Sequence, residues 1–332
     1  MMSETHSGGE RSGRLLSPRF QPAAAYLLAG SPRLPGNVEF IRVDDADVGP
    51  ILTHPEDGVV GHTIRTTKSW EPGEGRFLRS ILRPGMNVLD VGAYIGYFTL
   101  LFGRAVGPTG RVLAVEAEPD AFGVLRANVA LAGLDNVDLL PAAAHRDSGL
   151  ISITRNPFNP GSSTTVYQTQ DWKSSFVQAV RLDDVLEPAI PIHVIKIDVE
   201  GLDHAVVEGL ERTLRQWNPI VLLEFNPGWI DRLGERPDDV LRRYREIGRE
   251  VRVLGGDAIR LHRDAGMDIE ILLQDELLVT AENAAALIDA TRRIYYINLI
   301  LLPERRWPGL DSLYYTDEQR APGAVAVGDR LS

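Results

Sequence analysis

Short apolar runs alternate with helix-length segments through the middle of the chain. The runs cover residues 88–91, 112–115, 137–140, 194–199 and 220–225. Continuous apolar runs separated by helical segments are typical of βαβ units, in which both faces of a parallel sheet are buried. The pattern predicts an α/β protein with a doubly wound, mostly parallel sheet of Rossmann-like architecture.

The segments between these runs carry helical periodicity. Leu125, Val129 and Ala132 recur at helical spacing in a helix expected at about residues 121–131, and Gly133 stands where a C-terminal cap belongs. Further helices are expected at 202–214 and 240–247, two weaker strands at 251–254 and 259–261, and a stronger strand at 296–302.

The flanking regions are less regular. Residues 1–35 are rich in Ser, Gly, Pro and Arg without a sustained period, which predicts a disordered or loosely packed arm. Residues 36–85 are expected to form an N-terminal extension that ends in a short helix at 77–82, before the main α/β domain at 86–303 and a peripheral tail at 304–332. Residues 150–181 are expected to form an insertion loop.

Composition narrows the classes of function. The formal net charge of −11 disfavours a nucleic-acid partner, because the field of the protein would repel phosphates. The absence of cysteine removes disulfides and thiolate sites and fits a reducing compartment. With neither an apolar stretch of membrane-spanning length nor an apolar leader, the chain is expected to be cytoplasmic and to have no membrane partner.

The segment Asp90-Val-Gly-Ala-Tyr-Ile-Gly96 follows one strand and opens a helix. Its glycines allow a tight turn and close approach to a ligand at the carboxyl edge of the sheet. The spacing differs from a dinucleotide fingerprint, because Tyr94 and Tyr97 stand where that motif has glycines. Asp90 would repel a pyrophosphate but attract the sulfonium and ammonium of S-adenosylmethionine, and Glu116, at the end of the next strand, is placed to accept the ribose hydroxyls.

Several segments together resemble the FkbM family of S-adenosylmethionine-dependent methyltransferases, across roughly residues 58–303. The matching pieces are Trp70-Glu-Pro72, the Asp90 to Gly96 turn, Val115 to Pro119, Asn128, Asn136-Val137, Gly161 to Ser163, Leu182 to Asp184, Ile195-Lys-Ile-Asp-Val-Glu-Gly201 and Leu222-Leu-Glu-Phe225. One departure is Tyr94, where the family commonly has Asn. The resemblance implies methyl transfer, usually to a hydroxyl of a sugar or secondary metabolite.

The predicted cofactor site draws on the glycine turn, the following strand end and the extension. Trp70-Glu71 and the loop Asn159 to Thr165 are expected to be walls of the cleft. The residues assigned to S-adenosylmethionine are Glu71, Asp90, Gly92, Ala93, Tyr94, Gly96, Glu116 and Ala117.

Candidate catalytic groups follow the strand at 194–199. Lys196 and Asp198 lie on one face of this strand, and the buried ammonium needs a carboxylate partner, for which Asp198, Glu200 and Glu224 are the candidates. Asp198 is the first candidate for the base that removes the acceptor's hydroxyl proton, and His204 is the second because of its near-neutral pKa.

Several alternatives remain open at this stage. Asp198, Glu200 and Glu224 offer oxygen ligands that would suit magnesium, although their spacing is not distinctive and no metal ligand is assigned. The leading reaction is O-methylation of a small hydroxylated metabolite. Its rivals are N-methylation, methylation of a glycan or protein, a non-catalytic binding module, and a nicotinamide-dependent oxidoreductase.

Overall fold

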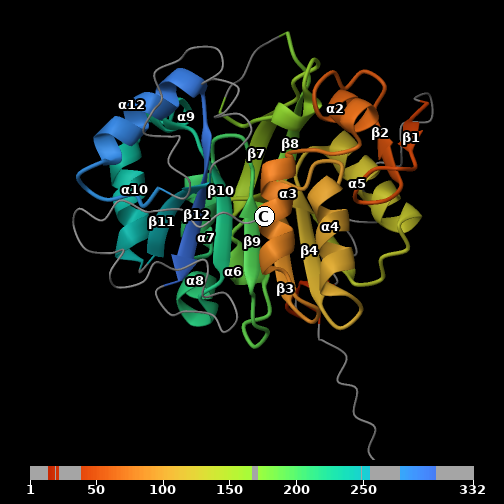
Figure 1. The fold of residues 1–332 in the computed structure, drawn as a ribbon, viewed down its shortest axis with the longest axis horizontal. Coiled ribbons are helices and arrows are strands. Elements are labelled where there is room, and N and C mark those ends of the chain that lie inside the picture. The colour runs from red at the N-terminus through yellow and green to blue at the C-terminus, as the bar shows by residue number, and fades with distance from the viewer. Residues whose placement is uncertain are drawn as a thin grey trace, which may run out of the picture.

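The computed structural model describes residues 14–18, 20–21, 39–166, 171–247, 249–254 and 277–303. Its central feature is a seven-stranded sheet with the order β11-β12-β10-β9-β3-β4-β5 (Figure 1). The strands are β3 (Asn87–Val91), β4 (Arg111–Glu116), β5 (Val137–Pro141), β9 (Val194–Ile197), β10 (Ile220–Phe225), β11 (Arg249–Leu254) and β12 (Ile297–Pro303).

Strand direction confirms the predicted doubly wound, mostly parallel sheet. Strands β5, β4, β3, β9 and β10 pair in parallel, whereas β12 is antiparallel to both β10 and β11. The strand order reverses between β3 and β9, and open α/β sheets bind ligands at the carboxyl edge of such a switch point.

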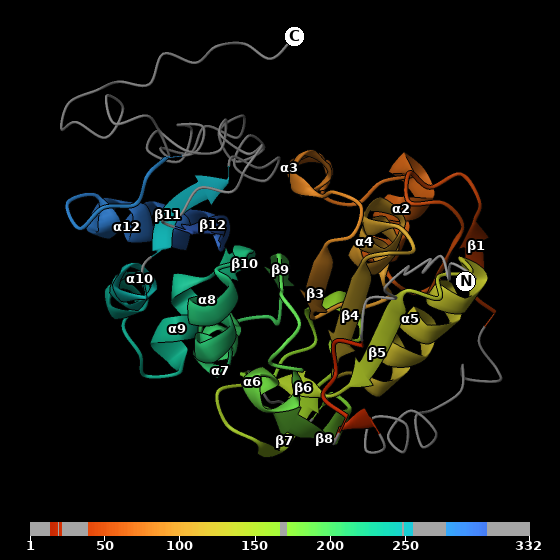
Figure 2. The same cartoon turned by 90° about the horizontal axis from the view of Figure 1, so that it is seen from below.

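Helices cover both faces of the sheet, as the view from below shows (Figure 2). One face carries α2 (Val60–Thr67), α3 (Pro72–Ile81), α4 (Tyr97–Val106) and α5 (Pro119–Leu131). The other face carries α6 (Leu182–Val185), α7 (Asp203–Gly209), α8 (Glu211–Trp217), α9 (Pro227–Arg232), α10 (Pro237–Glu246) and α12 (Ala284–Ile294).

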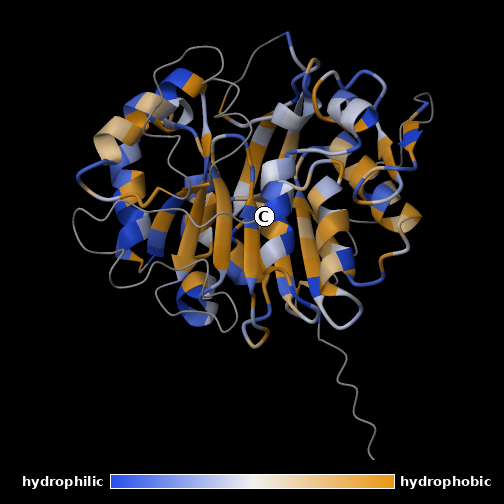
Figure 3. Ribbon diagram, viewed as in Figure 1, coloured by the Kyte–Doolittle hydropathy of each residue, from blue (hydrophilic) through white to orange (hydrophobic). Residues whose placement is uncertain are grey.

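Two hydrophobic cores follow from the alternation of side chains along each strand. In β3, Val88 packs with the helices α2 to α5, whereas Leu89 and Val91 pack on the opposite side. The central strands are mainly hydrophobic, while an outer helix such as α10 is largely hydrophilic (Figure 3). Because β3, β9 and β10 are apolar on both faces, any polar side chain in them stands out.

The N-terminal extension shares one of these cores. It contributes β1 (Ile41–Val43) and β2 (Ile51–Thr53), which form a separate two-stranded sheet, as well as α2 and α3. Ile51, Ile64 and Leu78 belong to the same buried cluster as Val88 and Leu100 of the central sheet and α4. The expected domain boundary at residue 86 is therefore not a break in packing.

Several local predictions need correction. The expected insertion loop contains β7 (Gly149–Thr154) and β8 (Ser174–Val180), which join β6 (Ala143–Ala144) in a three-stranded sheet, with the turn η1 (Pro160–Ser162) between them. Apolar residues at alternate positions of β8, Val177 and Ala179, face the small core of that sheet, a period of two that the irregular composition of the region obscured.

The helix expected at 202–214 is two helices, α7 and α8, which meet at Leu210. Helix α3 begins at Pro72, five residues before the expected start, and proline is well suited to the first turn of a helix. The prediction began too late because Gly73 and Gly75, which follow Pro72, weaken the helical pattern. Leu15 and Leu16, inside the arm expected to be loose, are buried, and Leu16 bridges Leu186. The strand expected at 259–261 and the tail after Pro303 lie outside the described residues.

Candidate active site

The glycine turn after β3 brings two strand ends together. Gly92 has a φ of 82°, and a Cβ atom placed on it would lie 1.8 Å from the backbone oxygen of Asp198. The backbone amides of Gly92 and Ala93 donate to the carbonyl of Val115 at 2.9 and 3.0 Å. A glycine at position 92 therefore allows β3, β4 and β9 to end at a single edge.

A cleft of about 600 Å³, counted with its open mouth, lies at this edge. Gly92, Tyr94, Glu116 and Ala117 of the predicted cofactor set line it. The small sheet closes one side with Ile151 and Ile153 of β7 and alanines of β6. The remaining wall includes Pro160, Gly161, Ser163, Thr165, Asp198, Val199, Glu200 and Leu202, so the expected loop wall at 159–165 does reach the cleft.

Glu116 supports the turn with its carboxylate. Tyr94 donates its backbone N–H to Oε2 at 2.8 Å, and Glu118 donates its backbone N–H to Oε1 at 2.7 Å. Burial raises the pKa of Glu116 to about 7, although these backbone donors oppose the shift. Glu116 also lines the cleft, and a carboxylate oxygen can accept more than one hydrogen bond, which suits it to accept hydroxyl hydrogens.

Asp90 lies beneath the turn rather than in the cleft. Its side chain is 1% exposed, and Thr99 of α4 donates its hydroxyl to Oδ2 at 2.5 Å. Oδ1 is buried without a hydrogen-bond partner. Burial raises the pKa of Asp90 to about 6, while Lys196 and Thr99 act in the opposite direction. The position of Asp90 therefore does not allow it to contact a ligand in this cleft directly, in contrast to the prediction from the sequence.

The other predicted cofactor residues are also set back from the cleft. Ala93 and Gly96 shape the turn, and the amide of Gly96 donates to the carbonyl of Ala93 at 2.8 Å. Glu71 precedes α3 with a φ of 43° and is half-buried beside Glu74 and Lys196. Trp70 is partly buried against the core around α2 to α5. None of these four residues lines the cleft.

Tyr94 connects the cleft to the N-terminal extension. Its hydroxyl donates to Oδ2 of Asp57 at 2.8 Å, and Asp57 also accepts the backbone N–H groups of Val59 and Gly61. Burial and the nearby carboxylate raise the pKa of Tyr94 well above its usual value. Asp57 was not foreseen, because a contact across 37 positions leaves no local pattern in the sequence.

Lys196 and Asp198 form the ion pair that the sequence suggested. Lys196 Nζ lies 2.8 Å from Asp198 Oδ2, and the ammonium sits 4.7 Å from the ring centroid of Phe98. Burial alone would lower the pKa of Lys196, but Asp198, Glu71 and Asp90 together raise it above its usual value. Asp198 lines the cleft, and 32% of its side chain is exposed.

His204 lies away from this cleft. It belongs to a separate pocket with Glu208, Arg243 and Tyr244, and its Nε2 is 3.3 Å from Oε1 of Glu235. Burial lowers its pKa to about 4. The structure therefore does not bring the second candidate base to Asp198, because α7 turns the imidazole toward α10.

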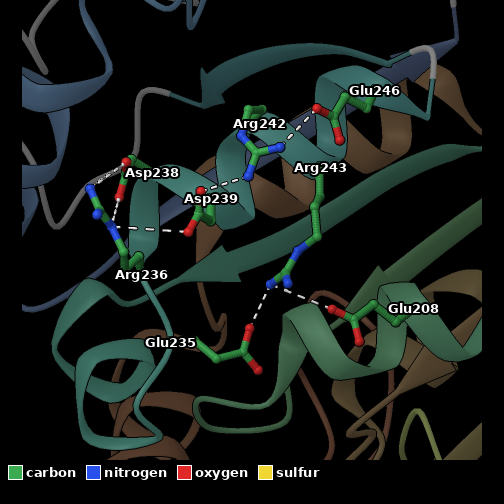
Figure 4. Close-up of polar contacts among 8 residues, drawn as sticks. All are labelled: Glu208, Glu235, Arg236, Asp238, Asp239, Arg242, Arg243 and Glu246. Atoms are coloured by element: carbon green, nitrogen blue, oxygen red, sulfur yellow. Dashed lines mark hydrogen bonds and ion pairs between the residues drawn. The ribbon is translucent and has the colours of Figure 1, made fainter.

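The surroundings of His204 are an ion-pair network (Figure 4). Arg243 of α10 lies 2.5 Å from Glu235 and 3.4 Å from Glu208, and Arg146 contacts the same two acids. Arg236, just before α10, and Arg242 within it pair with acids on the exposed surface: Asp238, Asp239 and Glu246. This network joins α7 to α10, which is a structural role.

The magnesium alternative finds no support in the geometry. Among residues whose placement is described, no three His, Asp or Glu side chains come together in an arrangement suited to a metal ion. Asp198 instead pairs with Lys196. His62 is exposed on α2 and takes no part in such an arrangement.

Over the same described ranges, no helix is both long and apolar enough to cross a bilayer.

The strand order and the glycine turn at the switch point define a class I methyltransferase fold. Residues 90–251 match the family model described as the methyltransferase FkbM domain. This match supports, for residues 90–251, the resemblance to the FkbM family of S-adenosylmethionine-dependent methyltransferases that the sequence showed.

More distant relatives share parts of this domain. The chain is 33% identical over 107 residues to the human transmembrane O-methyltransferase, covering 29% of this chain and 37% of that protein. It is 29% identical over 130 residues to a catechol O-methyltransferase of Niastella koreensis, covering 34% and 59% respectively. The chain thus spans less than two thirds of the length of either relative.

A solved FkbM methyltransferase from Methylobacillus flagellatus is also similar. It has 13% sequence identity and a TM-score of 0.38, with 73% of this chain and 52% of that chain covered. Similarity at this level supports no conclusion about the site.

Proposed function

We propose that the chain transfers a methyl group from S-adenosylmethionine to a hydroxyl of a small molecule, such as a sugar or secondary metabolite. The observation that carries the proposal is the cleft in which Gly92, Glu116 and Asp198 meet at the switch point of the sheet. The family of the domain and the O-methyltransferases among its relatives support the same chemistry.

The residues present fit this cofactor. Gly92 lines the cleft without a side chain, and Glu116 offers acceptors for ribose hydroxyls. Tyr94 and Ala117 line the same cleft as Gly92 and Glu116. Asp90, Ala93 and Gly96 would act by holding the turn, and Glu71 by its charge. When bound, S-adenosylmethionine supplies an electrophilic methyl group on a sulfonium.

Asp198 is the proposed general base. Lys196 holds Oδ2, which fixes the orientation of the carboxylate and leaves Oδ1 to accept the proton of an acceptor hydroxyl. Val199 and Leu202 add apolar wall beside it. A base in this position contributes about 100-fold or more to the rate.

The test is the Asp198→Asn variant, which keeps the shape of the side chain. Turnover with labelled S-adenosylmethionine should fall about 100-fold while cofactor affinity stays within a few-fold of wild type. His204→Gln serves as the comparison, because its imidazole faces another pocket, and should keep most of its activity. Locating the label on oxygen distinguishes this reaction from N-methylation, and an equally active Asp198→Asn enzyme would remove Asp198 as the base.

A further inference from the structure

A polar stripe crosses the sheet face that otherwise packs against α2 to α5. In register, Asp90 pairs with Lys196 across β3 and β9, and Glu224 pairs with Asn298 across β10 and β12. Their neighbours two positions away on the same face, such as Val88 and Leu222, are buried apolar residues. Alternation along the strands therefore places these polar side chains on one face, at its carboxyl end.

The cation in this stripe is already neutralised. Within the described part of the chain, Lys196 supplies the ammonium group of the stripe. Its Nζ lies 2.8 Å from Oδ2 of Asp198. Asn298 donates from its amide to Oε1 of Glu74 on α3, which adds another carboxyl. Glu71 lies beside Glu74, so the carboxyl groups outnumber the positive charge.

Glu224 adds a further buried carboxyl to this stripe. The residue is 9% exposed, and its Oε1 is buried without a hydrogen bond. Burial raises the pKa of Glu224 well above its usual value, and the charges of Glu200, Asp198 and Asp203 add to that shift. A buried oxygen without a partner costs free energy that folding alone does not recover.

Aromatic rings border the acids. Tyr296 directly precedes Ile297, which is in register with Phe225, the residue after Glu224. Burial raises the pKa of Tyr296, and Glu71 and Glu224 raise it further. Its neighbour Tyr295 is 6.2 Å away between ring centroids and is 55% exposed. Organic ammonium groups are bound by the combination of carboxylates with aromatic rings.

The stripe continues into the candidate active site. Asp198 and Glu200 line the cleft beside Gly92, and Leu223, next to Glu224, is in register with Ile197, next to Asp198. The ends of β9 and β10 therefore bring Glu224 next to Asp198, within the span of a small molecule that presents a hydroxyl to Asp198.

We propose that the acceptor carries a protonated amine as well as the hydroxyl, and that Glu224, with Glu200 and the tyrosines at the border, binds that ammonium. This substrate class, of which amino sugars are an example, rests on the methyltransferase function proposed above. Glu224 is a binding residue in this account, and Asp198 remains the base.

The experiment uses the full chain and matched pairs of hydroxylated amines and their N-acetyl derivatives, such as glucosamine with N-acetylglucosamine and galactosamine with N-acetylgalactosamine. Transfer of labelled methyl from S-adenosylmethionine is measured for each compound. The amine members should be accepted with a kcat/KM about ten-fold or more above that of their acetylated partners.

Glu224→Gln should reduce kcat/KM for the amines about ten-fold, mainly through KM, and leave the Kd of S-adenosylmethionine within about two-fold of wild type. Glu246→Gln, an exposed acid on α10, is the matched control and should change neither value. Equal or better use of the acetylated compounds, or no amine accepted while the cofactor binds, overturns this inference alone. Absence of cofactor binding overturns the proposed function, and the inference with it.

Discussion

Lys196 Nζ lies 2.8 Å from Asp198 Oδ2, at the point where β9 reaches the cleft. The pair orients the proposed base and also neutralises an ammonium whose side chain is 6% exposed. One short contact therefore couples the stability of the central sheet to the chemistry at its edge.

Replacing the lysine should separate these two effects. Lys196→Met keeps the length of the side chain but leaves Asp198 and Asp90 without a cation. Loss of the pair should lower the free energy of unfolding by roughly 2 kcal/mol, less than for a fully buried pair because a third of the Asp198 side chain is exposed. Chemical denaturation measures this change. Unaltered stability together with full turnover would show that the ion pair neither stabilises the sheet nor orients the proposed base.

The turn at Gly92 should not tolerate a side chain. Gly92→Ala would place Cβ 1.8 Å from the Asp198 backbone oxygen and strain a φ of 82°, so the two strand ends must separate. We expect a loss of at least about 2 kcal/mol in unfolding free energy and loss of cofactor affinity. The control is Gly133→Ala, whose φ is 63° with nothing within 4 Å, and which should cost about 1 kcal/mol without affecting the cofactor. Similar behaviour of the two variants would contradict the close-approach argument.

Tyr94→Phe should affect the extension more than the cofactor. The variant loses the hydroxyl that binds Asp57 but keeps the backbone N–H that binds Glu116. Unfolding free energy should fall by about 1 kcal/mol, while the Kd of S-adenosylmethionine changes less than about three-fold. Denaturation and calorimetry report the two quantities. A large loss of cofactor affinity would mean that the phenol itself contacts the ligand.

His204 should make stability depend on pH. Its folded-state pKa, lowered to about 4 mainly by burial, lies below the usual 6.5, so unfolding takes up a proton between these values. The stabilisation is complete above pH 6.5 and is lost as pH falls toward 4, at up to about 1.4 kcal/mol per pH unit. Glu235, whose pKa is lowered to about 2, responds only at lower pH.

The measurement is chemical denaturation of wild type and His204→Gln across pH 7.5 to 4.5. The difference between the two unfolding free energies should shrink as pH falls. His62→Gln, at an exposed position on α2, controls for the loss of a histidine and should follow wild type. A difference that stays constant with pH would refute the buried neutral imidazole.

The sequence predicted the central sheet well because apolar runs record burial directly. The strand Ile220–Phe225 has the bounds that its composition indicates, and the helix before Gly133 ends as its cap predicts. Strand β8 was missed because its exposed face includes Phe176, an apolar side chain that hides the alternation. The break between α7 and α8 follows Gly209, a signal hidden by the helical spacing of Val206, Leu210 and Leu214, which continues through it.

The site could be predicted only in part. Residues that follow a strand end, such as Gly92, Glu116 and Asp198, were placed correctly at the edge because parallel strands end together. The direction in which a helix turns its side chains is a property of packing, so the separation of His204 from Asp198 could not be read from their spacing. The hydrogen bonds of Tyr94 to Asp57 and of Asn298 to Glu74 depend on tertiary contacts and had no local signal.

Titration calorimetry with S-adenosylmethionine tests the central claim most directly. The account predicts binding of one cofactor per chain to wild type, and a loss of affinity of about ten-fold or more in Glu116→Ala, which removes the carboxylate both from the cleft and from the amide of Tyr94. Absence of binding to the wild-type chain, or an unchanged affinity in the variant, would contradict it.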